Sequence, residues 1–347
     1  MKLSTKEWKE FYIYDIFNHS RGKRQIAESR AKGNIAYYSA SNSNNGLTDF
    51  ISTPKFIVNT EAIIYTTFGD AYYVNSNFST SDEITILTSP KLNKYNALFI
   101  CCSIQQNKSK YSFGRKAFSN KIEKDKILLP VDKNNNLDWN FMDNYIKELE
   151  NNKIKKYEEY LINALKDIKY KKIFELNNKI WKSFFVTDIF PEIQRGKRLI
   201  KSKQIKGETP YISSTSLNNG VDNFVSNMHN VRRFSNCISI ANSGSVGSSF
   251  YQPFEFVASD HVTHLKNENM NKYTYLFIAT MTNRLSEKYN FNREINDYRI
   301  SRETIMLPIN ENEEPDYEYM EQFIKNLMFI KYNKYIEYIQ QGEYTTM

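Results

Sequence analysis

Residues 8–24, WKEFYIYDIFNHSRGKR, return with one inserted residue as residues 181–198, WKSFFVTDIFPEIQRGKR. The Trp-Lys and Asp-Ile-Phe elements recur at an offset of 173, and Arg-Gly-Lys-Arg recurs at an offset of 174. Asn44-Asn45-Gly46 returns as Asn218-Asn219-Gly220 at that second offset. Self-similarity in a fixed order indicates a repeated structural unit. The chain is therefore predicted to contain two copies of one domain.

The repeat continues to the end of both copies. After a four-residue insertion in the second copy, we expect one offset of 178, beginning with Phe56 and Phe234. The pairs that follow are Gly69 with Gly247, Tyr73 with Tyr251, Ser81-Asp82 with Ser259-Asp260, Leu98-Phe99-Ile100 with Leu276-Phe277-Ile278, Lys110-Tyr111 with Lys288-Tyr289, Phe113 and Arg115 with Phe291 and Arg293, and Leu129-Pro130 with Leu307-Pro308.

Composition agrees with an intracellular two-domain protein. With 347 residues, 40% of them hydrophobic, the chain can bury a sizeable core. Its net charge of +8 favours a polyanionic partner only weakly. The three cysteines, Cys101, Cys102 and Cys237, predict neither a disulfide framework nor a zinc site. No signal peptide and no run near the roughly 18 apolar residues of a membrane span is visible, so we expect a cytoplasmic protein without membrane contact.

Each copy begins with an α+β domain of short strands. Runs of β-branched and aromatic residues at 63–66, 84–87 and 238–240 are typical of strands, and both Asn-Gly pairs indicate turns. Residues 92–104 and 273–285 are more typical of helices.

Each copy ends in a long helix. Asp138 and Asp316 occupy N-cap positions, each followed by a periodic apolar run. The stripes comprise Ile154, Tyr157, Leu161, Leu165 and Ile168 in the first helix, and Met320, Phe323, Leu327 and Ile330 in the second. We expect the two helices to pack as an antiparallel, coiled-coil-like, pseudo-two-fold pair, the alternative being that each docks on its own domain. The expected divisions are domain 1 at 1–137, a central helix at 138–175, domain 2 at 176–315 and a C-terminal helix at 316–347.

The ordered pattern resembles the specificity subunits of type I and BcgI-like restriction–modification systems, with two target-recognition domains in tandem. The second copy is the closer match, because Gly244-Ser245-Val246-Gly247 before Phe250-Tyr251 resembles the family's Gly-turn-Gly segment. The first copy departs there, with Phe68-Gly69-Asp70.

The resemblance implies a non-catalytic subunit that reads a bipartite double-stranded DNA target, one half-site per domain. Methyltransferase subunits would be its partners, with a restriction or translocase subunit as a further candidate, and the complex would direct adenine methylation or cleavage. A helix of about 30 residues is roughly 45 Å long, comparable with the roughly 34–36 Å of one DNA turn, and would suit a spacer.

Three duplicated elements are candidate DNA contacts. The basic turns hold cations around a Gly that we expect to let backbone approach phosphate, and the alternative is a solvated turn. The polar loops offer amides and hydroxyls for phosphates or adenine, and the alternative is a locally capped turn. The Tyr/Arg elements would contact phosphate, sugar or guanine, and the alternative is a core Tyr beside a surface Arg. The candidates are Arg21, Lys23, Arg24, Arg195, Lys197 and Arg198 in the basic turns, Ser39, Ser41, Asn44, Asn45, Ser213, Ser214, Ser216, Asn218 and Asn219 in the polar loops, Ser243 and Ser245 in the second copy's Gly turn, and Tyr111, Arg115, Tyr289 and Arg293.

Enzymatic readings have less support. No adjacent prolines form a methyltransferase catalytic turn, and Gly244-x-x-Gly247 lacks the rest of a phosphate or dinucleotide loop, so no cofactor is expected. His261 and His264 would face opposite sides of a strand, so we expect no metal site. Four histidines in the whole chain offer little material for acid–base chemistry, and we expect no catalytic residues. A methyltransferase or nuclease with an unrecognised site, or a glycan- or protein-binding protein, remains the alternative.

Overall fold

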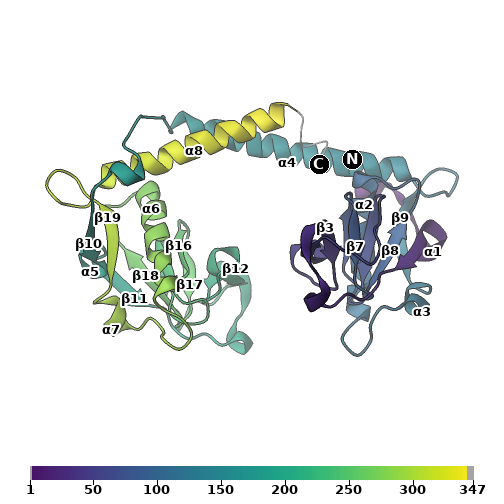
Figure 1. Cartoon of the computed structure of the whole chain (residues 1–347), viewed down its shortest axis with the longest axis horizontal. Helices are drawn as coiled ribbons and strands as arrows, with labels where there is room; N and C mark the ends of the chain where they lie inside the picture. Colours follow the sequence, from purple (N-terminus) through teal and green to yellow (C-terminus); the bar gives the residue numbers. More distant parts are fainter. Residues whose placement is uncertain (1, 342–347) are drawn as a thin grey trace. The chain divides into compact units, whose positions relative to one another are not determined.

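The computed structural model describes residues 2–341 and divides into two compact units, Met1–Tyr157 and Glu158–Met347 (Figure 1). Met1 and residues 342–347, the outer ends of the expected first domain and C-terminal helix, lie outside the described residues. In the described chain, no helix is long and apolar enough to cross a membrane.

Unit 1 holds three small sheets, and one helix packs against two of them. Its strands are ordered β1-β9, β2-β8-β5-β6 and β4-β3-β7. The elements are β1 (Glu7–Tyr12), α1 (Ile13–Ile16), β2 (Asn18–Arg21), β3 (Lys32–Tyr38), β4 (Leu47–Ile51), β5 (Ala62–Thr66), β6 (Ala71–Val74), β7 (Phe78–Thr80), β8 (Ile84–Thr88), α2 (Lys94–Gln105), α3 (Ser119–Ile122), β9 (Lys126–Val131) and most of α4 (Trp139–Lys166), with 3₁₀ turns at Leu3–Thr5, Ala27–Ser29, Asn44–Gly46 and Gln106–Lys110.

Unit 2 repeats this topology with one added short strand. Its sheets are β10-β19, β11-β18-β15-β16 and β13-β12-β17-β14. The elements are β10 (Trp181–Phe185), α5 (Val186–Ile189), β11 (Glu192–Arg195), β12 (Lys206–Ile212), β13 (Val221–Val225), β14 (Arg233–Phe234), β15 (Cys237–Ala241), β16 (Ser249–Gln252), β17 (Phe256–Ala258), β18 (Val262–Lys266), α6 (Lys272–Asn283), α7 (Asp297–Ile300), β19 (Thr304–Pro308) and α8 (Tyr317–Gln340), with 3₁₀ turns at Leu176–Asn178, Lys201–Lys203, Asn218–Gly220 and Arg284–Glu287.

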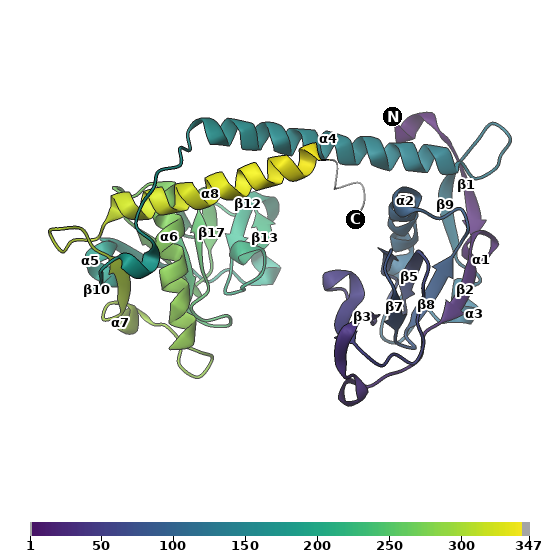
Figure 2. The ribbon, with the colours of Figure 1, turned by 45° about the horizontal axis from the view of Figure 1, so that its top comes forward.

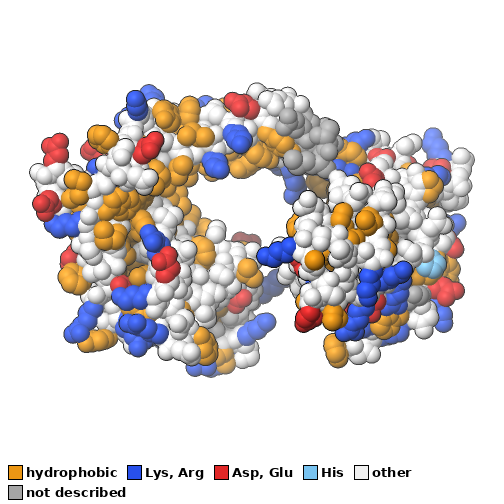
Figure 3. All heavy atoms as spheres, viewed as in Figure 1, with side chains coloured by type: hydrophobic (Ala, Val, Ile, Leu, Met, Phe, Trp, Pro, Cys, Tyr) orange, Lys and Arg blue, Asp and Glu red, His pale blue; other side chains and the backbone are white. Residues whose placement is uncertain are grey.

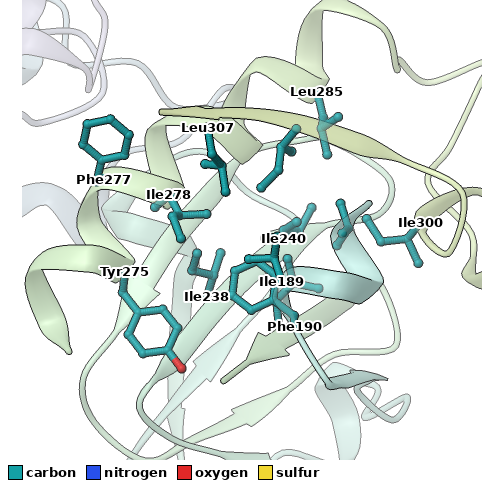
Figure 4. Packing of buried hydrophobic residues seen from close by; sticks show 14 of the residues in the cluster. Ile189, Phe190, Ile238, Ile240, Tyr275, Phe277, Ile278, Leu285, Ile300 and Leu307 are labelled. Atoms are coloured by element: carbon teal, nitrogen blue, oxygen red, sulfur yellow. The ribbon is translucent and has the colours of Figure 1, made fainter. Parts of the chain in front are cut away.

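The central strands are buried on both faces, which explains their continuous apolar sequence. All five residues of β5 and all five of β15 are buried, as expected for strands covered on both sides. In unit 2, α6 packs over β15 and β16, where Phe277, Ile278 and Tyr275 meet Ile238 and Ile240 (Figure 4). The strands expected at 63–66, 84–87 and 238–240 are thus confirmed, as are the helices expected near 92–104 and 273–285.

The pairing register corrects part of the expected alignment. Ile63 pairs with Leu87 in unit 1, and Ile238 pairs with Leu265 in unit 2. Since Leu87 and Leu265 correspond at the offset of 178, Ile63 corresponds to Ile238 at an offset of only 175. Three extra residues therefore lie in the turn after β15. The expected continuous offset of 178 was wrong before this turn, because an apolar strand looks alike under a small shift.

The same register changes which residue of unit 1 corresponds to Phe234. Phe234 pairs with Phe256 in unit 2, and Val58 forms a β-bridge with Phe78 in unit 1. Phe78 and Phe256 correspond at the offset of 178. Phe234 therefore matches Val58, and not Phe56 as expected.

Both long helices begin as expected. The Asp138 carboxylate accepts the backbone N–H of Phe141 at 2.9 Å, and Asp316 accepts that of Tyr319 at 2.9 Å. Each capping carboxylate also binds a lysine from before the domain's first strand, Lys6 at 2.5 Å or Lys179 at 2.6 Å. A carboxylate at a helix N-terminus stabilises the helix in two ways: it accepts a hydrogen bond from a free backbone N–H, and its negative charge interacts favourably with the helix dipole.

The first long helix ends earlier than expected. α4 stops at Lys166, and the segment up to residue 175 lies against α8 without regular structure. The Asn326 side chain binds both the backbone N–H and the carbonyl of Lys171, at 3.0 and 2.6 Å, and the Tyr170 and Phe329 rings lie 6.0 Å apart. Side chains of α8 thus satisfy backbone groups that a longer helix would have paired internally.

Within unit 2, the last turns of α4 run antiparallel beside α8 (Figures 1 and 2). Leu161 and Met320 from the expected apolar stripes are fully buried, whereas Leu327 and Ile330 are 43% and 52% exposed.

Candidate nucleic-acid interface

The basic turn of unit 1 rests on the Ser-Asp turn that precedes β8. The backbone N–H of Gly22 donates to Ile84 O, and that of Lys23 donates to Thr80 O, both at 3.1 Å. A Cβ at Gly22 would lie 2.8 Å from the Ser81 carbonyl carbon and closer still to its oxygen. The glycine is therefore required for close packing of the chain on itself, and the expected approach of a phosphate stays a prediction.

Unit 2 repeats this contact. Gly196 N–H donates to Val262 O at 2.9 Å and Lys197 N–H donates to Ala258 O at 3.0 Å, while a Cβ at Gly196 would collide with Ser259 O. The four cations that follow the two glycines, Lys23, Arg24, Lys197 and Arg198, are all exposed.

The first cation of each turn is held by the domain. Arg21 Nε donates to Asp82 O at 2.7 Å, and its guanidinium lies 4.7 Å from the Phe118 ring centre. Arg195 Nε lies 3.7 Å from Asp297 Oδ1. These two arginines are less available to a ligand than the lysine and arginine that follow.

The polar loops have asparagines where the backbone requires them. Asn44, Asn45, Asn218 and Asn219 all adopt left-handed φ values between 49° and 53°, a region that Asn tolerates better than other side-chain-bearing residues. Their side chains are nevertheless exposed. The turn interpretation accounts for the backbone, and DNA contact by the amides stays a prediction.

The serines of these loops share one backbone bond, from Ser39 N–H to Gly46 O at 3.0 Å and from Ser213 N–H to Gly220 O at 2.9 Å, but their other contacts differ. Ser39 Oγ bonds the Thr48 hydroxyl at 2.6 Å, and Ser41 Oγ accepts the N–H of Ser43 at 3.1 Å. Ser214 O accepts from Ser245 N, and Ser216 is exposed.

The three extra residues of unit 2, Ser243-Gly244-Ser245, lie against its polar loop. Ser245 N–H donates to Ser214 O at 3.0 Å, and a Cβ at Gly244 would lie 2.8 Å from that oxygen. Ser243 Oγ and His261 Nδ1 are 2.7 Å apart. The structure thus brings together the predicted polar loop and Gly turn of unit 2.

The Tyr/Arg elements form hairpins anchored on buried carboxylates. Tyr289, 4% exposed, donates its hydroxyl to Glu303 at 2.5 Å, and Lys288 Nζ lies 2.9 Å from the same carboxylate. Burial, followed by the bond to Glu303, raises the pKa of Tyr289 to about 12. Burial alone would raise the pKa of Glu303, but the bonds from Tyr289, Lys288 and the Thr304 N–H hold it below its usual value.

Unit 1 uses an aspartate in the same way. Tyr111 donates its hydroxyl to Asp125, and Lys110 Nζ lies 3.6 Å from this carboxylate. Asp125 also accepts the Tyr65 hydroxyl at 3.1 Å. Both hairpin tyrosines are thus engaged inside their domains, which favours a positioning role over direct DNA contact.

Each tip of these hairpins carries a phenylalanine that we did not select as a candidate from the sequence. Isolated antiparallel β-bridges pair the backbone of Ser112 with that of Arg115, and the backbone of Asn290 with that of Arg293. Each tip is therefore a tight turn. Phe113 and Phe291 at these tips are 84% and 78% exposed, and Arg115 and Arg293 are exposed as well. The available signal was an identical Phe in both copies with polar or glycine neighbours on either side.

Each hairpin is tied to the same end of its domain as the basic turn. Ala117 N–H donates to Thr67 O at 2.8 Å in unit 1, and Ile295 N–H donates to Asn242 O at 3.0 Å in unit 2. In unit 2, a cavity of about 750 Å³ lies between the basic turn and the segment after the hairpin. Its lining includes Arg195, Arg232, Asp260, His261, Glu294 and Asp297. We call the basic turn, polar loop, Ser-Asp turn and hairpin of a unit its recognition end.

Positive charge gathers at the recognition ends. In each unit, Lys and Arg side chains are prominent on the part away from the long helices, where α3 or α7 lies (Figures 1 and 3). Such a distribution suits a polyanionic ligand.

His264 of unit 2 has structural surroundings. His264 is buried, bonds Gln194 O through Nδ1 at 2.9 Å and stacks on Phe234 with ring centres 3.8 Å apart. Burial lowers the pKa of His264. Among residues 2–341, no group of three or more His, Cys, Asp or Glu side chains is arranged to hold a metal ion.

Comparisons with known proteins agree with the duplication. The model of the type I restriction modification DNA specificity domain matches residues 5–159 and again residues 178–338. The type II restriction enzyme BgcI specificity subunit S.BcgI of Heyndrickxia coagulans is 28% identical over 332 residues, covering 92% of this chain and 94% of the relative. The crystal structure of a type I restriction-modification system S subunit from M. genitalium has the same fold, with a TM-score of 0.53 at 14% identity over 99% of this chain and 96% of that one. The chain therefore belongs to the type I restriction modification DNA specificity domain family, with two copies of the domain in tandem.

Proposed function

We propose that this chain is the DNA-recognition subunit of a restriction–modification complex and reads a bipartite double-stranded target, one half-site per domain. The observation that carries the proposal is the recognition end, which is built twice from the same elements. Each copy combines exposed cations, exposed amides and an exposed arginine on a rigid support. Membership of the DNA specificity domain family supports the same function.

The candidate contacts divide by chemistry. Lys23, Arg24, Lys197 and Arg198 are exposed beside a fixed backbone and suit phosphates, which position a protein without reading sequence. The amides and hydroxyls of the polar loops suit base edges or phosphates, and Arg115 and Arg293 suit phosphate or guanine.

The partners would be DNA methyltransferase subunits, with a restriction or translocase subunit as a further candidate. S.BcgI is itself the specificity subunit of a restriction enzyme, so catalysis belongs to other subunits and this chain supplies recognition. Such a complex works in the cytoplasm. We place the domains at 1–137 and 176–315, with α4 as the spacer between them and α8 closing the second copy.

The experiment is a salt titration of DNA binding by the native complex with its methyltransferase. The variant is Lys197→Ala with Arg198→Ala. The matched control is Lys182→Ala with Lys272→Ala, which removes equal charge outside the recognition end, at the ion pair of Lys182 with Glu313 and at the first residue of α6. Each lost phosphate contact should reduce the slope of log affinity against log salt by roughly 0.9. The slope should thus fall by nearly two in the variant, with weaker binding to every sequence, and stay unchanged in the control. Equal slopes in variant and control would contradict the proposed phosphate contacts.

A further inference from the structure

An exposed phenylalanine stands at the same place in both recognition ends. Phe113 and Phe291 are the most exposed large hydrophobic residues of the described chain, at 84% and 78%. An apolar ring in water is unfavourable, and a domain with an adequate core gains nothing from it. Such a residue, present at both hairpin tips, indicates a ligand that covers it.

The tips are held too firmly to be loose loops. In unit 2, Tyr289 and Lys288 both bind the buried Glu303 carboxylate just before the tip, and Ile295 is fastened to Asn242 just after it. The Phe291 ring is therefore presented on a fixed support, which is what insertion into a ligand requires.

Unit 1 presents its ring in the same way. Tyr111 binds Asp125 before the tip, and Ala117 N–H binds Thr67 O after it. The tip residues themselves differ, Ser112 and Gly114 standing where unit 2 has Asn290 and Asn292, while Phe and Arg are kept. The pair is thus retained where its neighbours have changed.

The positive charges near the two phenylalanines indicate what kind of ligand would cover them. Arg115 follows Phe113 by two residues, and Arg293 follows Phe291 by two. Lys116 Nζ lies 5.5 Å from the Phe113 ring centre, while Arg299 and Arg302 follow the second hairpin on α7 and the turn after it. An apolar ring flanked by cations is complementary to stacked bases between phosphates.

We propose that Phe113 and Phe291 are wedge residues, which insert between adjacent base pairs at each half-site while Arg115 and Arg293 neutralise the flanking phosphates. Apolar side chains that enter a base step partly unstack it and kink the duplex. Each domain would then read the ease with which its step is opened, in addition to base edges. This inference rests on the proposed function.

The test uses the native complex and target duplexes with 2-aminopurine at successive positions through each half-site. The fluorescence of this base rises when it is unstacked. The methyltransferase itself extrudes the adenine that it methylates, so a rise is expected there in every variant. With the wild-type complex we expect a rise at one further step per half-site. Phe113→Ala should abolish it in one half-site and Phe291→Ala in the other, each weakening binding by roughly tenfold, as for a lost base–aromatic contact. Phe291→Leu, which keeps an apolar wedge, should retain much of the signal.

The matched control is Phe174→Ala, because Phe174 is 69% exposed and lies against α8, where its carbonyl accepts the Tyr319 hydroxyl. It should change neither fluorescence nor affinity. A wild-type complex that binds no DNA would overturn the proposed function itself. A complex that binds its target with flat fluorescence at every position other than the methylated adenine, or with a rise at such a position that survives both alanine variants, would overturn only the wedge. Loss of the methyltransferase subunit from either Phe→Ala variant, with the fluorescence rise intact, would instead make the tip a protein contact and also overturn the wedge.

Discussion

Gly22→Ala separates two roles of the Arg-Gly-Lys-Arg turn, packing and ligand approach. The added Cβ would meet the Ser81 carbonyl and Thr80 Oγ1. If the turn moves away, the bonds from Gly22 and Lys23 to β8 and β7 are lost, each worth about 0.5–1.5 kcal/mol. If it stays, overpacking costs about 1–3 kcal/mol. Either response should lower the free energy of unfolding by about 1–3 kcal/mol.

Gly114→Ala is the matched control in the same unit, because no atom lies within 4 Å of the Cβ position at Gly114. This substitution should change the free energy of unfolding by less than about 1 kcal/mol, and a small gain is possible through the unfolded state. Urea unfolding followed by circular dichroism measures both variants, and thermal unfolding should show a difference of about 2–4 °C per kcal/mol.

The reasoning fails if Gly22→Ala is as stable as Gly114→Ala yet binds DNA more weakly than the wild-type complex. That result would mean that the glycine is there for a phosphate, as its sequence context first indicated.

Three further outcomes are expected. Glu303→Gln should destabilise unit 2 by about 1–3 kcal/mol at neutral pH, because the Tyr289 and Lys288 bonds lose their charged acceptor. The folded pKa of Glu303 is depressed, so this contribution exists above the ordinary carboxyl pKa and disappears as pH falls through the folded value; urea unfolding between pH 3 and 7 checks it, and a gap independent of pH would contradict it. Deleting residues 243–245 should give unit 2 a turn as short as that of unit 1 and leave the unfolding midpoint nearly unchanged. Selection from random DNA should then show an altered preferred sequence in one half-site only, and changes in both half-sites would count against this. Inserting one helical turn after Leu161 should shift the preferred gap between half-sites in the same selection, and a fixed gap would contradict the spacer role of α4.

Much of the fold could be predicted because the chain repeats itself. Asp138 and Asp316 at the caps, the buried strand 62–66 and the Asn-Gly turns each carry a local signal that survives without tertiary knowledge. The end of α4 could not be predicted, since Asn326 pairs the backbone of residue 171 from far along the chain. Nothing local to Lys171 shows this.

The recognition end was only partly predictable for a similar reason. Exposure depends on what the rest of the chain covers, and by residue type alone a Phe is more often fully buried than a Tyr. The structure reverses that ranking, with Phe113 at 84% exposure and Tyr289 at 4%. The buried acceptors that explain it, Asp125 and Glu303, lie 14 residues away from their tyrosines.

The three-residue difference after β15 shows where this domain tolerates change in length. The pairing of β15 with β16 and β18 matches that of β5 with β6 and β8, so the insertion is absorbed without disturbing a core strand. The entropy of closing a loop grows only slowly with its length, by about 0.6 kcal/mol for each doubling. Surfaces that would face a ligand can therefore gain or lose residues while folding stability stays nearly constant. The two copies in this chain show two outcomes of that freedom, one with a single-glycine turn and one with a longer serine-lined turn.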